Sequence, residues 1–514
     1  MRLVSRIRRI KCDEHKPECF KCQLSDRKCD GYENPEDMVD RRRRGAAKSN
    51  RSLSSTPPAT SSTPSIMVIN TDIIGELDER RSFHHFRIRT ADDLSGCFDS
   101  NFWNRLVLQL SHSEPAIKHA LIALGDAHES YQAGRIDSFI SPGLALQQYN
   151  RAISFLNHQL SNPSRRATEV ALICCVIFIC FESVRGNYDA ALLHLKSGID
   201  ILKSRNLATG KGGSGDVPYL DPQTDEDDLI ELFTRLDVSA SAFLDIQPPQ
   251  LAMRLSDSLP DLATHQFQDL VEGRKYLQRL VNMCLHLVLS QYQYRVNRSL
   301  LPVEAEAERT KLMSAVRQWA VQFDALLKSP AMTDLSGRSL QGAFTLIMQQ
   351  KTILIILEAS PFSDMRMLEP FEEDVESIVS IATWLVRTSG PFPESGSKSA
   401  FTGKAQLEAG EAPKFTADMG IIAPLYYVAL NCPNPSIRQR ALDVLKIPRR
   451  EGLWDSVLVY NIAEKVQGVD GQQMLDSFVG SVAELAQALG AAPKPSASIK
   501  RRLSSTSLAK YRSE

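Results

Sequence analysis

The stretch AIKHALIALGDAHESY (116–131) decides the fold class of this chain. Apolar residues recur in it at intervals of three and four, as they do along one face of an α-helix. Three neighbouring stretches show the same spacing: FWNRLVLQL (102–110), ALQQYNRAISFLNHQL (145–160) and DAALLHLKSGIDILKSR (189–205). The segments SEP (113–115) and SNPS (161–164) suit the breaks between helices. Together these stretches predict consecutive amphipathic helices.

Helical spacing continues through most of the remaining chain. Further helices are predicted at 226–245, 264–295, 303–328, 337–359, 368–388, 417–431, 435–446, 453–466 and 472–489. Alternating strand patterns and hairpin signals such as Asn-Gly are nearly absent. Two segments, TGKGGSGD (209–216) and the Gly/Ser-rich 389–406, are predicted to be exposed loops. The sequence therefore predicts an all-α domain over residues 67–490.

Charge is distributed unevenly along the chain. The 514 residues carry a net charge of −1, yet the first 60 hold 15 lysines and arginines against nine acidic residues. Hydrophobic content of 43% and charged content of 24% are typical of a globular protein. A basic end on a nearly neutral body indicates a small nucleic-acid-binding module joined to a domain of another kind.

The apolar segments and the cysteines indicate the compartment. The longest apolar run, Val170 to Phe181, has twelve residues, whereas a membrane-spanning helix needs roughly twenty. No apolar segment typical of a secretory signal follows Met1. We therefore expect no membrane association and a reducing compartment, in which clustered cysteines favour metal over disulfides.

Four of the ten cysteines cluster near the start of the chain. Intervals of six, two and six residues separate Cys12, Cys19, Cys22 and Cys29. Zinc prefers a tetrahedral set of thiolates, and four sulfurs can close one such site but not two separate ones. So short a segment lacks the apolar residues for a core, so zinc binding would supply its folding energy. The spacing predicts a zinc module.

This segment resembles the fungal zinc binuclear cluster (Zn2Cys6) of transcription factors. That family repeats the pattern Cys-x2-Cys-x6-Cys and carries a basic run between its second and third cysteines. Here the basic run consists of Arg6, Arg8, Arg9 and Lys11. Pro17 matches the proline of the family's connecting loop, and the four cysteines fall where the third to sixth belong.

The chain departs from the family pattern at its first two cysteines. Their positions hold Arg2 and Ser5, and a serine hydroxyl is a poor substitute for a thiolate. Two explanations are open. The true start of the protein lies upstream of Met1, which we favour because the following residues fit the pattern closely, or the cluster has degenerated. An intact module holds two zinc ions, and this chain as written would hold one or an incomplete site.

The resemblance also implies how DNA would be bound. In the family, the short helix after the second cysteine enters the major groove. Arg8 and Arg9 would approach base edges there, with Arg6 and Lys11 nearer the phosphates. Arginine can donate two hydrogen bonds to guanine, and the family typically reads CGG triplets. A second basic run is expected to serve nuclear import: Arg41, Arg42, Arg43 and Arg44.

The helical body resembles the fungal-specific transcription factor domain found behind this cluster. Residues 83–130, 181–202 and 420–456 carry the resemblance, which spans most of residues 70–490. It implies an all-helical regulatory domain, a kind of domain that is sometimes proposed to sense ligands or partners. A homodimer and transcriptional co-regulators are possible partners besides double-stranded DNA, and no coiled-coil pattern follows the cysteine module.

No catalytic constellation is found in the body. His112, His119 and His128, with Asp126 and Glu129, do not share one helix face, and we expect ordinary surface or core side chains. Three cysteines in an apolar helix are expected to be buried small hydrophobic residues: Cys174, Cys175 and Cys180. TGKGGSGD lacks the GxxxxGK[ST] pattern of a phosphate-binding loop. The protein is therefore not expected to be an enzyme.

The sequence thus predicts four parts. Residues 1–32 form the partial zinc module, 33–66 a disordered basic and Ser/Thr/Pro-rich linker, 67–490 the regulatory domain and 491–514 a disordered basic tail. The leading hypothesis is a nuclear, sequence-specific regulator of RNA polymerase II genes. One rival is an interaction protein whose degenerate cluster no longer binds DNA directly. The other is a helical enzyme or small-molecule binder, which would need a deep polar pocket.

The tail motif KRRLS (500–504) resembles a basophilic kinase site.

Overall fold

The computed structural model describes the helical body of the chain. It covers residues 73–466 apart from 74, 99, 136–142, 163, 209–224, 245–247, 252–264, 292–293, 295–300, 334, 360–368 and 389–412. The predicted zinc module, linker, two exposed loops, helix at 472–489 and basic tail lie outside the described residues. The described elements therefore all fall within the predicted regulatory domain.

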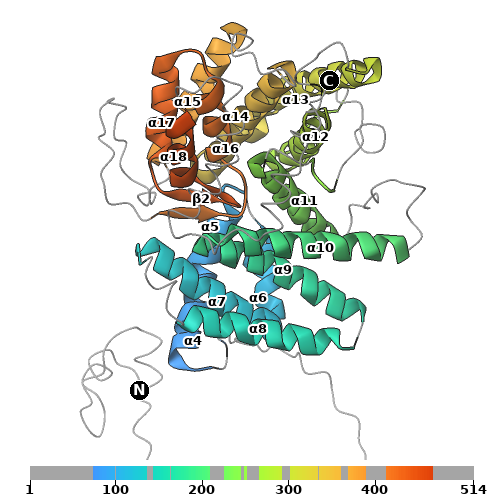
Figure 1. Cartoon of the computed structure of the whole chain (residues 1–514), viewed down its shortest axis with the longest axis vertical. Helices are drawn as coiled ribbons and strands as arrows, with labels where there is room; N and C mark the ends of the chain where they lie inside the picture. The colour runs from blue at the N-terminus through green and yellow to red at the C-terminus, as the bar shows by residue number, and fades with distance from the viewer. Residues whose placement is uncertain are drawn as a thin grey trace, which may run out of the picture. The chain divides into compact units, whose positions relative to one another are not determined.

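Helices dominate the described residues, so the predicted all-α class is confirmed (Figure 1). In chain order they are α4 (Leu77–His85), η1 (Phe86–Thr90), α5 (Ala91–Ser95), η2 (Phe102–Leu106), α6 (Val107–Leu110), α7 (Pro115–Gln132), α8 (Leu144–Leu160), α9 (Arg165–Arg185), α10 (Tyr188–Ala208), α11 (Asp225–Leu244), α12 (Leu270–Ser290), α13 (Val303–Leu327), η6 (Pro330–Met332), α14 (Gly337–Ala359), α15 (Glu372–Thr388), α16 (Ile422–Asn431), α17 (Pro435–Leu445) and α18 (Ser456–Val466). The elements η1 and η2 are single π-helical turns.

Some helices begin later than the sequence pattern predicts, for identifiable reasons. The helix expected from 264 starts at Leu270, because the Asp269 carboxylate accepts from the amide of Glu272 and caps the first turn. The helix expected from 417 starts at Ile422. There the carboxylate of Glu451 accepts hydrogen bonds from the amides of residues 420–422.

The sequence patterns did not predict the small sheet. Strands β1 (Lys414–Thr416) and β2 (Arg449–Glu451) pair in parallel, and β2 pairs antiparallel with β3 (Trp454–Asp455). The turn between β2 and β3 uses Gly452, whose φ of 57° suits glycine. The helix predicted from residue 453 therefore starts at Ser456. Strands of two or three residues are too short to show an alternating pattern.

The core helix of the body is α9. Ser164 caps its start by accepting from the amide of Ala167, and Gly186 ends it in the left-handed conformation. Its mean hydropathy reaches 2.1 over an 18-residue window, and 89% of that window is buried. Helix α14 also has the length and composition of a membrane span, with 56% of its window buried. A helix that is apolar on all sides and packed between α7 and α10 is a core helix.

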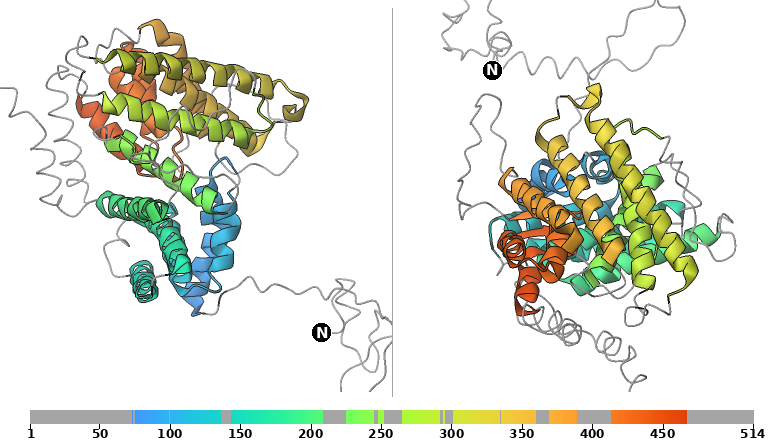
Figure 2. Two further views of the ribbon diagram at one scale, coloured as in Figure 1. Left: turned by 90° about the vertical axis from the view of Figure 1, so that its right-hand side faces the viewer. Right: turned by 90° about the horizontal axis from the view of Figure 1, so that it is seen from above.

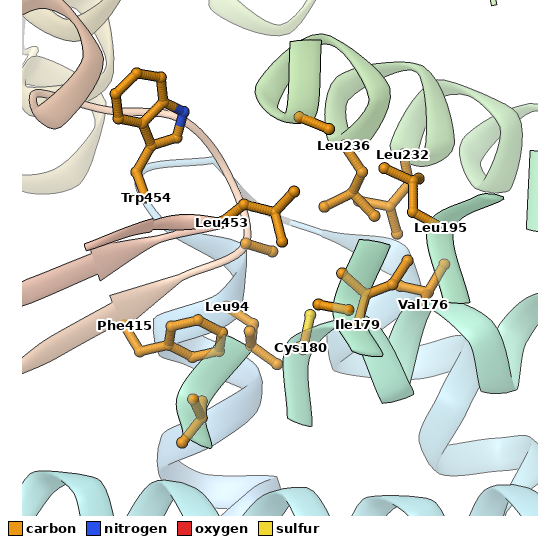
Figure 3. Packing of buried hydrophobic residues seen from close by; sticks show 14 of the residues in the cluster. Leu94, Val176, Ile179, Cys180, Leu195, Leu232, Leu236, Phe415, Leu453 and Trp454 are labelled. Atoms are coloured by element: carbon orange, nitrogen blue, oxygen red, sulfur yellow. The ribbon is translucent and has the colours of Figure 1, made fainter. Parts of the chain in front are cut away.

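Buried apolar side chains form two clusters. The first gathers residues from α4 to α11, from α14 and α15, and from β1 to α18; the close view shows Leu94, Ile179, Leu236 and Phe415 among them (Figure 3). The second lies among α12, α13 and α14, which pack side by side (Figure 2). Met419 packs against both clusters. Chain segments far apart in sequence therefore share one core.

Candidate functional site

The residues predicted to bind zinc and DNA lie outside the described residues, and they remain predictions. They are Cys12, Cys19, Cys22 and Cys29 for zinc, Arg6, Arg8, Arg9 and Lys11 for DNA, and Arg41, Arg42, Arg43 and Arg44 for nuclear import. The four thiols suit a single tetrahedral zinc ion by the chemistry of the donor set. The structure can place only the candidate residues of the body.

The histidines of α7 face different neighbours. Nδ1 of His119 lies 2.5 Å from Oε1 of Gln148, and its ring stacks on Phe155 with 5.3 Å between centroids. His128 lies nine residues later and is fully buried against the Thr90 hydroxyl, 3.0 Å from Nδ1. Among the described residues no three His, Cys, Asp or Glu side chains converge on a possible metal position. Both histidines belong to packing contacts.

A buried polar cluster joins α5 to α7. Nε2 of His128 lies 3.6 Å from the Asp93 carboxylate, which also accepts from Gln132 Nε2 at 2.9 Å. Burial, together with the nearby His85, lowers the pKa of His128 to about 3, so its ring is neutral. Burial, assisted by the charge of Asp92, raises the pKa of Asp93 to about 6. The cluster contains no activated nucleophile, and it fixes α5 against α7.

The cysteines of α9 are buried small hydrophobic residues, as predicted. Cys174, Cys175 and Cys180 are between 0% and 6% exposed. Burial raises the pKa of the Cys175 thiol to about 12. It also raises the pKa values of the Cys174 and Cys180 thiols. The thiols therefore stay protonated and carry no nucleophilic reactivity at neutral pH.

An ion-pair group ties the segment after β1 to α11 and α12. The Asp418 carboxylate accepts from Nε of Arg235 at 2.9 Å and from Nη2 of Arg274. Burial alone would raise the pKa of Asp418, but the two arginines outweigh it and hold that pKa below its usual value. The guanidinium of Arg274 also lies over the Phe98 ring, 4.4 Å from its centroid.

Arg450 on β2 binds the carbonyl groups at the carboxyl end of α9. Its guanidinium donates to the carbonyl oxygen of Ser183 at 3.2 Å and to that of Val184. It also pairs with Asp455 at 2.8 Å and lies over the ring of Tyr131. A cation at the carboxyl end of a helix satisfies carbonyls that have no partner within the helix.

Sequence reasoning missed these polar contacts because their partners lie far apart in the chain. Asp418 and Arg235 are 183 positions apart, and Arg450 and Ser183 are 267 positions apart. No local spacing signals such a pair. The segment 414–455, which holds Asp418 and Arg450, has about the same charged fraction as the whole chain, 24%, so its composition gave no signal either.

Comparisons with known proteins bear on both parts of the chain. Residues 81–374 match the family described as fungal specific transcription factor domain. Residues 6–38 match the fungal Zn(2)-Cys(6) binuclear cluster domain. The match therefore starts after positions 2 and 5, where the family pattern has its first two cysteines. The chain thus carries both family signatures.

Two curated relatives are similar over different extents. The aspercryptin biosynthesis cluster-specific transcription regulator atnN of Emericella nidulans is 24% identical over 90% of this chain and 85% of its own length. The transcription regulator lscL of Purpureocillium lilacinum is 33% identical over 39% of this chain and 48% of its own length. No solved structure matches the chain.

Proposed function

The chain belongs to the fungal transcription factors that carry this regulatory domain, and we propose that its zinc module reads CGG-type half-sites in the major groove. The chain is a DNA-binding transcription regulator with a zinc-binding module. The observation that carries the proposal is the basic run Arg6 to Lys11 directly ahead of Cys12. In this proposal Arg8 and Arg9 donate to guanine O6 and N7, and Arg6 and Lys11 bind phosphates.

The donor set decides how many zinc ions the module holds. With Cys12, Cys19, Cys22 and Cys29 alone, we propose one zinc ion with four thiolate ligands. Two ions would need the further thiolates that positions 2 and 5 lack. The ion would supply structure, because metal bound to four protein thiolates leaves no open position for catalysis.

Zinc stoichiometry and DNA binding, measured on the same proteins, test this proposal. The full chain should hold about one zinc ion, and the variant Arg2→Cys/Ser5→Cys should hold about two. Both should prefer a CGG duplex to a scrambled duplex of equal length. Replacing Arg8→Ala/Arg9→Ala should cut that preference at least tenfold, because each bidentate guanine contact discriminates by about 1–3 kcal/mol.

The opposite results separate the proposal from its rival. If neither protein distinguishes the two duplexes while both bind zinc, the module is structural and the chain acts through protein partners. If only the six-cysteine variant distinguishes them, the four-cysteine module is degenerate as written. The variant Arg6→Ala/Lys11→Ala should weaken binding to both duplexes about equally, since phosphate contacts carry little sequence information.

We propose nuclear action for the same chain, with Arg41 to Arg44 as the import signal. The named role of the relative from Emericella nidulans supports control of one biosynthetic gene cluster as the pathway-level function. We further propose residues 67–490 as the regulatory domain, between a disordered linker at 33–66 and a tail at 491–514. A fluorescent fusion with all four arginines replaced by alanine should lose its nuclear enrichment.

A further inference from the structure

Polar side chains line the place where α11 meets α12. The two helices are neighbours in the body (Figure 1). We call their contact the polar joint, and its polar residues are Glu231, Arg235 and Asp237 of α11 and Arg274, Lys275 and Asn282 of α12. Across it, Nζ of Lys275 lies 3.7 Å from the Glu231 carboxylate. Ion pairs and hydrogen bonds therefore contribute to holding α12 against α11.

Asp418 joins the two helices at the polar joint. Its carboxylate accepts from Arg235 on α11 and from Arg274 on α12, so one acid holds both guanidinium groups. The side chains of the two arginines are only 20% and 11% exposed. Without the carboxylate, two like charges would face each other with little water between them, and the helices would be pushed apart.

The position of Asp418 is fixed from the side of the first apolar cluster. Phe415, three residues earlier, is 1% exposed in that cluster. The amides of residues 420–422, just after Asp418, donate to the carboxylate of Glu451 on β2. If α12 moved away, Asp418 would therefore stay in place and the contact to Arg274 would break.

A second bridge crosses the polar joint about two turns further along α12. The amide of Leu251 donates to the Asp237 carboxylate at 2.7 Å, and the carbonyl of Leu251 accepts from the Asn282 side chain at 2.9 Å. Asp237 and Asn282 are 3% and 0% exposed, and the Leu251 side chain belongs to the first apolar cluster. Here too a polar group, and not an apolar one, ties α12 to that cluster.

The two apolar clusters are divided differently among the helices. Leu277 of α12 and Trp319 of α13 belong to the second cluster, whereas α14 contributes Leu357 to the second cluster and Ile355 to the first. Separating α12 from α13 or α14 would expose large apolar side chains to water. Opening the polar joint exposes mainly groups that water can solvate, together with Val238 of α11. The joint is therefore the plane at which α12 can part with little loss of apolar burial.

We propose that the polar joint is a latch within the regulatory domain. When it is closed, α12 and α13 are held against α11, and when it is open they swing as one unit about α14. The second cluster stays packed in both arrangements, because Val238 is the only one of its buried members in the described residues that belongs to α11. Opening releases Arg274 and Lys275 to water and leaves Asp418 paired with Arg235. Packed units that move about a shared helix are a common way for a domain to change shape.

Thiol alkylation of the full zinc-loaded chain, mapped to each cysteine by mass spectrometry, tests the latch. The variant Val238→Cys places a thiol on α11 against the second cluster, where opening of the joint exposes it. The native Cys284 reports unfolding of α12, because it is 0% exposed in the second cluster and lies about 200° around the helix from Asn282. In the Val238→Cys background, Asp418→Asn should speed alkylation of the introduced thiol at least about tenfold and that of Cys284 less than about twofold.

A matched variant controls for the loss of one acidic charge. Asp324→Asn removes an acid that pairs with Lys328 at the end of α13, where both side chains are mostly exposed, and it should leave both alkylation rates unchanged. A milder variant covers the case in which Asp418→Asn does not fold. Glu231→Gln removes only the partly exposed pair with Lys275, and it should give a smaller increase that is confined to the introduced thiol. Circular dichroism compares the helical content of all variants.

Three outcomes would overturn the inference. Equal acceleration at the introduced thiol and at Cys284 would mean that α12 unfolds and does not swing. Acceleration at the buried cysteines of α9 as well would mean that the whole body is destabilised. Unchanged alkylation in both Asp418→Asn and Glu231→Gln would mean that the polar joint does not hold α12 in place. None of these measurements involves DNA, so the inference stands or falls separately from the proposed reading of CGG sites.

Discussion

At the scale of single residues, Asp93 is held where its charge is unfavourable. Its carboxylate accepts one hydrogen bond from Gln132 and faces the neutral ring of His128. The pKa of about 6 exceeds the value near 3.9 expected in the unfolded chain. The folded protein thus holds this proton more tightly, so its free energy of unfolding should fall as pH rises from about 4 to about 6 and then level off.

Replacing Asp93→Asn removes this penalty and keeps an oxygen to accept from Gln132. The variant should be more stable than wild type by about 1 kcal/mol at pH 7 and equal to it at pH 4. The effect stays small because the side chain is 35% exposed, and water screens its charge. Guanidinium unfolding at both pH values measures it.

The control is Asp443→Asn on the surface of α17, where the carboxylate pairs with Lys446. That change should alter stability by less than about 0.5 kcal/mol at either pH. If Asp93→Asn instead proved less stable than wild type at pH 7, the fold would favour the charged carboxylate and the argument from burial would be wrong.

At the scale of elements, Gly125 allows α4 to lie directly against α7. A Cβ atom at this position would lie 2.2 Å from the carbonyl oxygen of Ser82 and 3.1 Å from Cβ of Phe86. The oxygen belongs to the main chain and cannot rotate away as a flexible side chain would. The packing of α4 against α7 depends on this close approach.

The change Gly125→Ala sets two effects against each other. Helix propensity should improve stability by about 1 kcal/mol, while overpacking against a fixed carbonyl costs about 1–3 kcal/mol or more. We expect the free energy of unfolding to fall by about 2 kcal/mol, because the added Cβ would lie far closer to the Ser82 carbonyl oxygen than a normal van der Waals contact. Thermal unfolding measures it. Asn150→Ala, at an exposed position on α8, should be neutral or slightly stabilising, and a similar result for Gly125→Ala would contradict the packing argument.

How far the elements could be predicted depended on the length of their patterns. Helices such as 303–327 and 337–359 span six or more turns, and their periodicity located them to within a residue. Strand β1 has three residues, and it pairs with residues 35 positions away. Nothing local marks it. The start of α16 was missed for a similar reason, since the carboxylate that caps it belongs to Glu451.

The candidate sites also differ in how far the sequence could predict them. The zinc module could be read from the sequence because Cys12 to Cys29 and the adjoining arginines follow a strict local spacing. The contacts of Asp418 and Arg450 could not, because each joins residues that only the fold brings together. The exposure of Arg89 lies between these cases, because the arginine is visible in the sequence but lies on a π turn that the sequence does not signal.

At the scale of the whole molecule, the body extends past the residues that match the regulatory-domain family. The match ends at residue 374, yet Phe415, Leu425 and Trp454 are all at most 3% exposed in the first apolar cluster. Just after strand β1, the amide of Ala417 also donates to the carbonyl of Leu94. The segment from 413 to 466 therefore completes the core.

A chain of residues 67–490 should accordingly unfold in one cooperative thermal transition, whereas a chain of residues 67–388 should not. The shorter chain exposes apolar surface that Phe415 and its neighbours cover, so it should aggregate in size-exclusion chromatography. Matching melting curves for the two chains would show that the last helices and the sheet are accessory. Circular dichroism at 222 nm follows both transitions.

The hydrogen bonds from Arg450 to the end of α9 also affect how the protein is made. The carbonyls of Ser183 and Val184 leave the ribosome well before their partner, because 267 residues separate Arg450 from Ser183. At roughly 5–20 residues per second, that interval lasts about 13–50 seconds. Throughout this interval the core helix α9 lacks the guanidinium that later bonds to the carbonyls at its end. Nascent chains should therefore depend on chaperones during this interval, and slower translation of the intervening codons should lower the yield of native protein.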